Sequence, residues 1–391
     1  MKKKILSFLI AFCLVVPCAF TLVACKDKAP KMEVWDGSIA EVSQAVNNVI
    51  IIDTAEELAG FAKSVNSGND YAGKTVKLAC DMDMANKTWT PIGVGNRKKL
   101  TAGTTYKFSG TFDGNGKRIF NLSNEGYVPS EVNKTSESDL GNEGKTYSYG
   151  FFGITKNATI KNLTLEVDFD CDDENLKGDS VGGLVGFANE GLTIINCTVK
   201  GEIDGGYDAV AGLVGRAYNS TSEKSVIIEN CVNNAEVEAM FKAAGIIGYA
   251  NSDNLYLKID NCVNNGNIEV NGMERDGTIC SVVSGILNYG WTSLEINNTI
   301  IVTNNKNTGI LESVEELIAG KENKHAYTYI ACSIANEYRE GYSIYNFEGN
   351  SNTGLVKYLD EIATDTLGAT IRQLYTEYQT SQDYNLRSNI R

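Results

Sequence analysis

The stretch Gly183-Leu-Val-Gly186, followed by Ile194-Ile-Asn-Cys197, decides the fold because both phrases recur along the chain. The glycine phrase occurs at four more places, the last ending in Asn288: Gly150–Gly153, Gly212–Gly215, Gly245–Gly248 and Gly285–Asn288. The second phrase places an asparagine two residues after an isoleucine at six positions: Asn121, Asn162, Asn196, Asn230, Asn261 and Asn298. These asparagines lie 31 to 41 residues apart. A period in this range predicts a repeat architecture.

The sequence between the phrases predicts strands and no helix. Each unit holds two or three short runs of β-branched residues separated by Asn, Gly and Asp. Such units fit an all-β solenoid, the parallel β-helix, whose coils stack about 4.8 Å apart and align equivalent residues in ladders. We expect the isoleucines, and the Leu or Cys after each asparagine, to fill the core. We expect the asparagines to lie at a corner, where they tolerate left-handed backbone, and the glycines to let the chain turn. A WD-type propeller fits less well because its Gly-His and Trp-Asp signatures are missing.

The N-terminus has the pattern of an export signal. Basic residues Lys2 to Lys4 precede a mostly apolar run from Ile5 to Ala24, and polar residues follow Cys25 at once. The stretch Leu22-Val-Ala-Cys25 resembles the lipobox of bacterial lipoproteins. That resemblance implies that residues 1–24 are a signal peptide, that Cys25 is lipidated (palmitate among the acyl chains), and that the protein is exported and faces outward from the envelope. A plain membrane anchor and an ordinary secretion signal are the alternatives.

Composition divides the rest of the chain into six parts. Residues 25–48 are predicted as the lipidated cysteine and a tether. Residues 49–122 are predicted as an N-terminal cap and the first coils, with Thr54-Ala-Glu-Glu57 as a capping box that opens an amphipathic helix over the end of the core. Further parts are an inserted loop (123–148), regular coils (149–305), an irregular final coil with a helical cap (306–379) and a disordered tail (380–391). The helical cap rests on the apolar spacing from Leu355 to Tyr378.

Charge and cysteine usage exclude several functions. The formal net charge is −14, and it becomes −17 once Lys2, Lys3 and Lys4 leave with the signal, so nucleic acid is not an expected partner. Seven cysteines remain after Cys13, Cys18 and Cys25, an odd number without a CxxC pair, so no disulfide framework is implied. The chain has a single histidine, His325, which argues against a Cys/His metal site and a Ser-His-Asp centre. Three cysteines fall in one ladder and are expected to pack in the core, although a redox role or disulfide pairing is not excluded: Cys197, Cys231 and Cys262.

The glycine phrases resemble the GLUG motif of bacterial surface proteins. The likeness extends to Trp35-Asp-Gly-Ser-Ile-Ala40, Trp89-Thr-Pro-Ile-Gly93 and Gly110-Thr-Phe-Asp-Gly-Asn-Gly116, and it covers residues 33–305, about 70% of the chain. It implies a right-handed, pectin-lyase-like β-helix on an envelope-anchored protein, of the kind found in adhesins and in non-catalytic regions of surface proteases. No His-Glu-x-x-His occurs, so no protease domain of that type is expected. Because Asn288 stands where the motif has glycine, the final coil is expected to be irregular.

Two groups of residues are candidate binding sites. The densest acidic run predicts a calcium site or, more simply, a solvated loop: Asp168, Asp170, Asp172, Asp173 and Glu174. The residues after the glycine phrases would form an aromatic and cationic stripe that stacks on sugars or partner side chains, if they point outward rather than pack at a corner: Phe187, Arg216, Tyr249 and Tyr289.

The leading hypothesis is a non-catalytic, envelope-anchored β-helix lipoprotein that binds a carbohydrate or protein surface, with adhesion as its role and no cofactor beyond possible calcium. The first alternative is a polysaccharide lyase or glycosidase, because the implied fold also carries such enzymes. Its candidate groups are three aspartates and two cations, which do not recur at matching coil positions: Asp204, Asp208, Asp253, Arg216 and Lys242. The second alternative is a structural spacer or assembly subunit.

Overall fold

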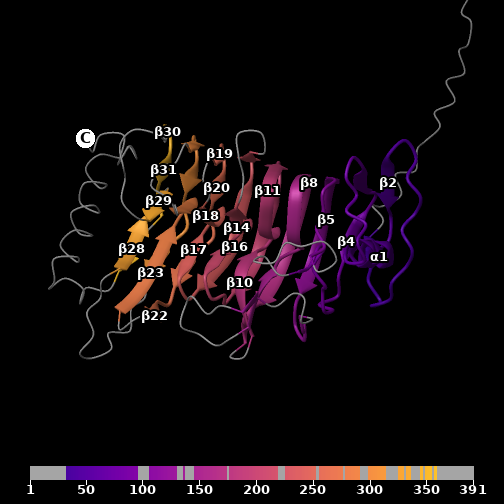
Figure 1. Ribbon diagram of the computed structural model, residues 1–391, viewed down its shortest axis with the longest axis horizontal. Helices are drawn as coiled ribbons and strands as arrows, with labels where there is room; N and C mark the ends of the chain where they lie inside the picture. Colours follow the sequence, from indigo (N-terminus) through magenta and orange to yellow (C-terminus); the bar gives the residue numbers. More distant parts are fainter. Residues whose placement is uncertain are drawn as a thin grey trace, which may run out of the picture. The chain divides into compact units, whose positions relative to one another are not determined.

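The computed structural model describes residues 32–95, 105–129, 135–136, 145–173, 176–218, 225–251, 255–275, 278–290, 298–313, 325–329, 332–335, 344–346, 348–354 and 356–358. Within them the chain is mostly β, with stacked parallel strands and one helix (Figure 1). The signal sequence, Cys25 and residues 359–391, which include most of the expected helical cap and the expected tail, lie outside the described residues.

A complete coil contains four strand positions, so the stacked coils form four columns of parallel strands. The first column follows the glycine phrases: β8 (Phe152–Asp170), β11 (Val185–Ile195), β14 (Val214–Tyr218), β18 (Ile247–Asn251), β24 (Leu287–Gly290) and β29 (Cys332–Ala335). The second column precedes the asparagine phrase: β2 (Val49–Ile52), β3 (Thr75–Leu78), β5 (Thr111–Ser123), the middle of β8, the end of β11, β15 (Val226–Glu229), β19 (Tyr256–Asp260), β25 (Thr299–Thr303) and β30 (Ile344–Asn346).

The third column follows the asparagine phrase: β1 (Met32–Val34), β4 (Asp81–Asp83), the ends of β5 and β8, β12 (Thr198–Asp204), β16 (Val232–Ala239), β20 (Val263–Asn264), β21 (Ile268–Val270), β26 (Lys306–Asn307), β27 (Leu311–Ser313), β31 (Ser351–Asn352) and β32 (Val356–Tyr358). The fourth column is a separate sheet: β7 (Lys145–Tyr149), β10 (Leu176–Gly182), β13 (Ala209–Ala211), β17 (Lys242–Ala244), β23 (Thr278–Ser284) and β28 (His325–Tyr329). Short antiparallel strands flank this sheet: β6 (Thr135–Ser136), β9 (Asp172–Asp173) and β22 (Met273–Arg275).

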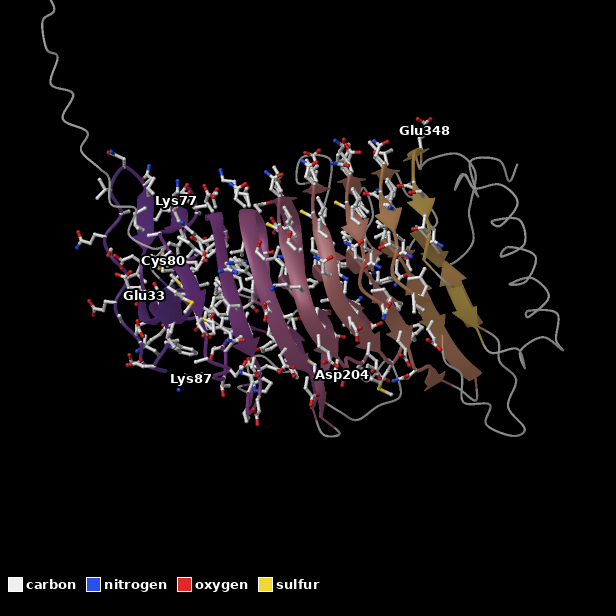
Figure 2. The ribbon with its side chains drawn as sticks, turned by 180° about the vertical axis from the view of Figure 1, so that it is seen from behind. Glu33, Lys77, Cys80, Lys87, Asp204 and Glu348 are labelled. Atoms are coloured by element: carbon white, nitrogen blue, oxygen red, sulfur yellow. The ribbon has the colours of Figure 1, made fainter. Side chains whose placement is uncertain are left out.

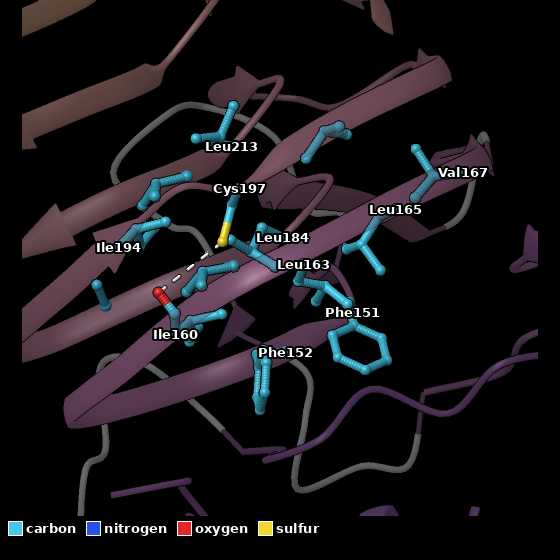
Figure 3. Close-up of a cluster of buried hydrophobic side chains, with 14 of the residues drawn as sticks. Phe151, Phe152, Ile160, Leu163, Leu165, Val167, Leu184, Ile194, Cys197 and Leu213 are labelled. Atoms are coloured by element: carbon cyan, nitrogen blue, oxygen red, sulfur yellow. Dashed lines mark hydrogen bonds between the residues drawn. The ribbon is translucent and has the colours of Figure 1, made fainter. Parts of the chain in front are cut away.

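The predicted isoleucine ladder is confirmed as the centre of the core. Ile160, Ile194, Ile228 and Ile259 are in register from coil to coil, and each side chain is fully buried. In Figure 3, Ile160 and Ile194 lie beside Leu163 and Cys197 in this core. Burial of one apolar side chain per coil at this position repeats the same contribution to stability, about 1.5–3 kcal/mol for each isoleucine.

The cysteine ladder packs as predicted, and the thiols are free rather than disulfide-bonded. Cys197, Cys231 and Cys262 are buried. The Cys197 Sγ donates to the Ile160 carbonyl in the preceding coil at 3.8 Å (Figure 3), and Cys262 repeats this contact with the Ile228 carbonyl at 3.6 Å. Burial raises the pKa of Cys197 and Cys262, which favours the neutral thiol that a hydrophobic core accepts.

The asparagine ladder adopts left-handed backbone, as expected, at five of the six predicted positions. Asn121, Asn162, Asn196, Asn230 and Asn261 have φ between 53° and 55°. The sixth prediction is wrong, because Asp260 pairs with Thr303 and the residue after Thr303, Asn304, has the matching φ of 56°. Asn298 instead is buried and accepts a hydrogen bond from the Leu255 amide at 2.7 Å.

The glycine phrases mark the bend between the fourth and first columns, as predicted, but close packing rather than left-handed backbone requires glycine there. A Cβ on Gly215 would lie 2.5 Å from the Val181 amide nitrogen, and one on Gly248 would lie 2.6 Å from the Val210 carbonyl oxygen. Both contacts are with backbone in the preceding coil, which cannot move away cheaply. Neither glycine has a positive φ.

Helix α1 (Ala55–Val65) begins at the predicted capping position. The Thr54 hydroxyl accepts a hydrogen bond from the Glu57 amide at 3.1 Å, and the Glu57 carboxylate accepts one from the Asp53 amide at 3.0 Å. The helix packs Leu58, Phe61 and Val65 into the core. The segment that precedes α1 in the sequence crosses the surface of this helix, since the Ala40 amide donates to the Glu56 carbonyl.

Three predicted boundaries differ from the structure. Residues 32–34, expected in the tether, form β1 and pair with β4, because Trp35 next to them is buried against Trp89. Residues 145–148, expected in the inserted loop, belong to β7 in the fourth column. Parallel pairing continues past residue 305 through β26, β27 and β32, so residues 356–358 form a strand where the apolar spacing predicted a helix.

Candidate functional site

Three charged side chains from two neighbouring coils meet at the corner between the fourth and first columns. The Asp208 carboxylate, just before β13, accepts from Lys242 Nζ at 2.5 Å and pairs with Arg216 of β14. Arg216 also donates to Ser180 Oγ at 3.2 Å. Both cations lie over the Tyr249 ring, at 5.0 Å from its centroid for Arg216 and 4.7 Å for Lys242. We call Asp208, Arg216, Lys242 and Tyr249 the corner cluster.

The three charged members of the corner cluster are buried and Tyr249 is half-buried, and none of the four belongs to the main hydrophobic core. Asp208 and Arg216 are each 6% exposed and Lys242 is 7% exposed. Burial lowers the pKa of Lys242, while the Asp208 carboxylate opposes that effect. For Tyr249, whose charged form is the anion, burial has the opposite effect and raises the pKa to about 12. A buried carboxylate that binds two cations compensates their loss of hydration and fixes the relative positions of two neighbouring coils.

The predicted stripe has the expected register but not the expected exposure. Phe187, Arg216 and Tyr249 pair in successive strands of the first column. Phe187 is 1% exposed and stacks on Tyr218, so the outward-facing stripe is wrong and corner packing is correct. The stripe ends there, because Tyr289 pairs with Ala250 after a shift in register. The Tyr289 side chain lies outside the described residues.

The predicted acidic run is divided between two elements. Asp168 and Asp170 lie near the end of β8, exposed on the outer face of the third column, and pair with Glu202 and Asp204. The side chains of Asp172 and Asp173 in β9, and all of Glu174, lie outside the described residues. No group of three or more His, Cys, Asp or Glu side chains in the described part of the chain is arranged to hold a metal ion.

The third column carries a shallow acidic groove on its outer face. Its volume is about 150 Å³, and no lysine or arginine lines it among the side chains that the structure describes. Glu202 pairs with Glu236 in the next coil, and Glu238 pairs with Glu269, which in turn pairs with Glu312. We call the six lining carboxylates the acidic groove: Glu202, Asp204, Glu236, Glu238, Glu269 and Glu312.

Elsewhere on the outer face, lysines pair with carboxylates of the neighbouring coil or of the same strand. Lys258 Nζ lies 2.5 Å from Glu229 and 3.5 Å from Asp260, and Lys200 pairs with Glu166. Like charges directly opposite one another on neighbouring strands are unfavourable, as at Glu202 and Glu236, whereas Glu312 at the edge of the groove is in register with Lys357 of β32. The groove therefore has the electrostatic character of a surface that favours a cationic partner.

The candidate catalytic groups are separated rather than assembled on a surface. Asp204 lines the acidic groove, whereas Asp208, Arg216 and Lys242 form the buried corner cluster. Asp253 lies outside the described residues. A polymeric substrate would need access that the exposures of 6–7% in the corner cluster do not provide.

The sequence reading missed the acidic groove and a second, buried asparagine ladder. The groove was visible as an alternation of acidic and apolar residues in Glu202-Ile-Asp204 and Glu236-Val-Glu238. The buried ladder consists of Asn233, Asn264 and Asn307, which are joined to one another and to Asn352 by side-chain hydrogen bonds of 2.6 to 2.8 Å. Its signal was an asparagine two residues after Cys231 and Cys262.

Comparison with known proteins assigns no family. No family model matches the chain, and no curated protein matches it. Among solved structures it is similar to a "putative immunoglobulin A1 protease" from Bacteroides ovatus, at 16% identity and a TM-score of 0.39, over 83% of this chain and 87% of that one. A likeness at this level carries no argument about function. No helix in the described ranges is long and apolar enough to cross a membrane.

Proposed function

We propose that this chain is an exported, lipid-anchored surface protein that binds a partner through the acidic groove and performs no catalysis. The proposed fold is the right-handed parallel β-helix of GLUG-type repeats, with Cys25 as the lipidated residue and adhesion as the biological role. One observation carries the proposal: six carboxylates from four coils line a single groove, without a lysine or arginine among its described lining residues.

The groove favours a protein partner with a basic segment over a carbohydrate. Neighbouring strands place successive carboxylates about 4.8 Å apart, a spacing that an extended chain with lysine or arginine at intervals can follow. Neutral glycans carry no positive charge that could pair with the carboxylates, and acidic glycans are repelled by them. Calcium bridging to an acidic ligand is a second way to use the same carboxylates.

The proposal is tested by incubating the mature protein on arrays of glycans, extracellular-matrix proteins and Lys- and Arg-rich peptides, with and without calcium. We expect retention on basic peptides or on proteins with basic segments, and weaker retention at high salt because exposed charges are screened. An absence of retention on every array would refute the binding role. Retention only on acidic glycans with calcium would replace the basic partner by calcium bridging.

A polysaccharide lyase is the second candidate, favoured by one observation. Burial lowers the pKa of Lys242, which favours the neutral amine that can remove a proton, but at 7% exposure the corner must open before a substrate reaches this lysine. Incubation with acidic polysaccharides tests this function. Unsaturated products that disappear in Lys242→Met, but not in Lys258→Met, would favour the lyase, and their absence from the unmodified protein would exclude it for those substrates.

A further inference from the structure

The exposed large hydrophobic side chains of the described residues concentrate on the first coil. Met32 and Val34 lie on β1, Ile51 lies on β2, and Ile39 and Val46 lie on the chain between these strands. Their exposed fractions range from 45% for Ile51 to 71% for Val46. Only Val128 in the described residues is a large, exposed hydrophobic side chain away from this coil.

The strand register shows that these outward positions are apolar in the first coil but not in the second. Met32 pairs with Asp81 and Val34 pairs with Asp83, while Ile51 pairs with Lys77. The second coil thus carries charged residues at the same outward positions at which the first coil carries apolar ones. Solvent alone does not explain this difference, because both coils present these positions to the outer face.

The first coil also ends the stack. Among the described strands, β1 pairs only with β4 and β2 pairs only with β3, so one backbone edge of each lacks a neighbouring strand. Natural proteins commonly protect such edges with charges or with a covering surface. Figure 2 shows Glu33, Lys77 and Lys87 at this end of the stack and Glu348 at the opposite end.

The first coil is close in sequence to the proposed lipid anchor. The chain advances seven residues from Cys25 to Met32, and a fully extended chain of that length spans at most about 25 Å. A tether of this reach holds the N-terminal end of the stack near the bilayer whatever its conformation. At such effective concentrations, even weak apolar contacts with the membrane become populated.

We propose that the N-terminal end of the stack docks on the bilayer that holds the lipid, with Met32, Val34 and Val46 entering its interfacial region. This inference rests on the proposed lipidation of Cys25. Docking would seat the first coil on the membrane and hold the stack at a defined angle to it. The acidic groove, whose carboxylates lie on β12, β16, β21 and β27 of later coils, would then be presented away from the lipid.

Quenching by brominated lipids tests the docking in the full lipidated protein, reconstituted in phosphatidylcholine vesicles. A fluorophore is attached at Ala45→Cys on the first coil or at Ser351→Cys on the last described coil, both exposed positions. The parent protein, labelled in parallel, measures background from native cysteines. We expect quenching several-fold stronger at residue 45 than at residue 351. The triple variant Met32→Asn, Val34→Asn and Val46→Asn should lose most of the quenching at residue 45 while still floating with the vesicles.

The outcomes separate this inference from the proposed function. Protein that floats with vesicles but shows equally weak quenching at both labels keeps its anchor and overturns the docking. Protein that fails to float overturns the lipid anchor itself, and the docking with it. Cross-links between copies at residue 45, lost on dilution of the protein in the membrane, would show that a second copy covers the first coil instead.

Discussion

The side chain of Asn264 donates a hydrogen bond to the side chain of Asn307 at 2.6 Å, one coil further along the stack. The same Asn264 accepts a hydrogen bond from Asn233 at 2.8 Å and donates a second to the Gly266 carbonyl at 2.9 Å. All three asparagines are at most 1% exposed. A buried polar chain of this kind stabilises the fold only while each member is satisfied, so it links the coils to one another.

Replacement of Asn264 should therefore destabilise the stack more than replacement of its neighbour. Asn264→Ala leaves groups of Asn233 and Asn307 without a partner, at a cost of about 2–4 kcal/mol in the free energy of unfolding. Asn265→Ala, at an exposed position, should cost at most about 0.5 kcal/mol. Urea unfolding of both variants measures the difference. Equal costs for the two would contradict the role given to the buried ladder.

Asp208 should be essential to stability because two buried cations depend on it. Asp208→Asn removes the charge that compensates Arg216 and Lys242, and the expected loss is about 3–5 kcal/mol in the free energy of unfolding. As the matched control, Glu229→Gln weakens the more exposed pair with Lys258 and should cost no more than about 1 kcal/mol. Thermal and urea unfolding measure both costs. Near-normal stability of Asp208→Asn would show that the corner cluster is dispensable.

Tyr249 should make the protein less stable at alkaline pH. Burial, partly opposed by Arg216, raises the pKa of Tyr249 from 10.0 to about 12. The contribution of neutral Tyr249 to the free energy of unfolding is complete below pH 10. It is lost between pH 10 and 12, because in this range only the unfolded chain releases the phenolic proton. The loss is on the order of 2–3 kcal/mol. In Tyr249→Phe the fall in the free energy of unfolding over this window should be shallower by that amount, and an unchanged slope would contradict the assignment.

Cys197 and Cys262 should react with alkylating reagents only when the coils open. Cys197 and Cys262 are buried and their raised pKa values keep them protonated, so modification requires local or global unfolding. We expect iodoacetamide to label these thiols at least about 100-fold more slowly in the folded protein than in the protein unfolded in urea. Mass mapping of each peptide measures the labelling. The exposed thiol of Ala45→Cys provides the unprotected reference in the same sample. Rapid labelling of Cys197 or Cys262 in the folded protein would contradict the packed ladder.

The repeat phrases were sufficient to predict the parallel strands, the isoleucine core and most of the asparagine corner. These features depend on local chemistry that recurs at a constant offset, such as the left-handed backbone at Asn196. The last copy was misassigned because Val302 and Asn305 replace Ile and Cys in the true phrase, while Ile296-Asn-Asn298 imitates it. Register alone separates Asn304 from Asn298.

The candidate site was less predictable because it depends on which faces are covered. The phrases correctly aligned Phe187 with Arg216, but they could not show that Phe187 packs on Tyr218 or that Arg216 bonds to Ser180 of the fourth column. The acidic groove depends on the register between coils of unequal length, which places Glu238 beside Glu269 although they are not at equal offsets from the glycine phrases. Only the three-dimensional pairing brings these carboxylates together.

The most direct test of the groove compares two charge-matched variants on a Lys- and Arg-rich peptide array at low salt. One variant neutralises the groove (Glu202→Gln, Glu236→Gln, Glu238→Gln), and the other neutralises three exposed carboxylates outside its lining (Glu41→Gln, Asp70→Asn, Glu125→Gln). We predict that the groove variant loses retention while the control variant keeps that of the unmodified protein. Equal retention of the two variants, or no retention of the unmodified protein, would contradict the account.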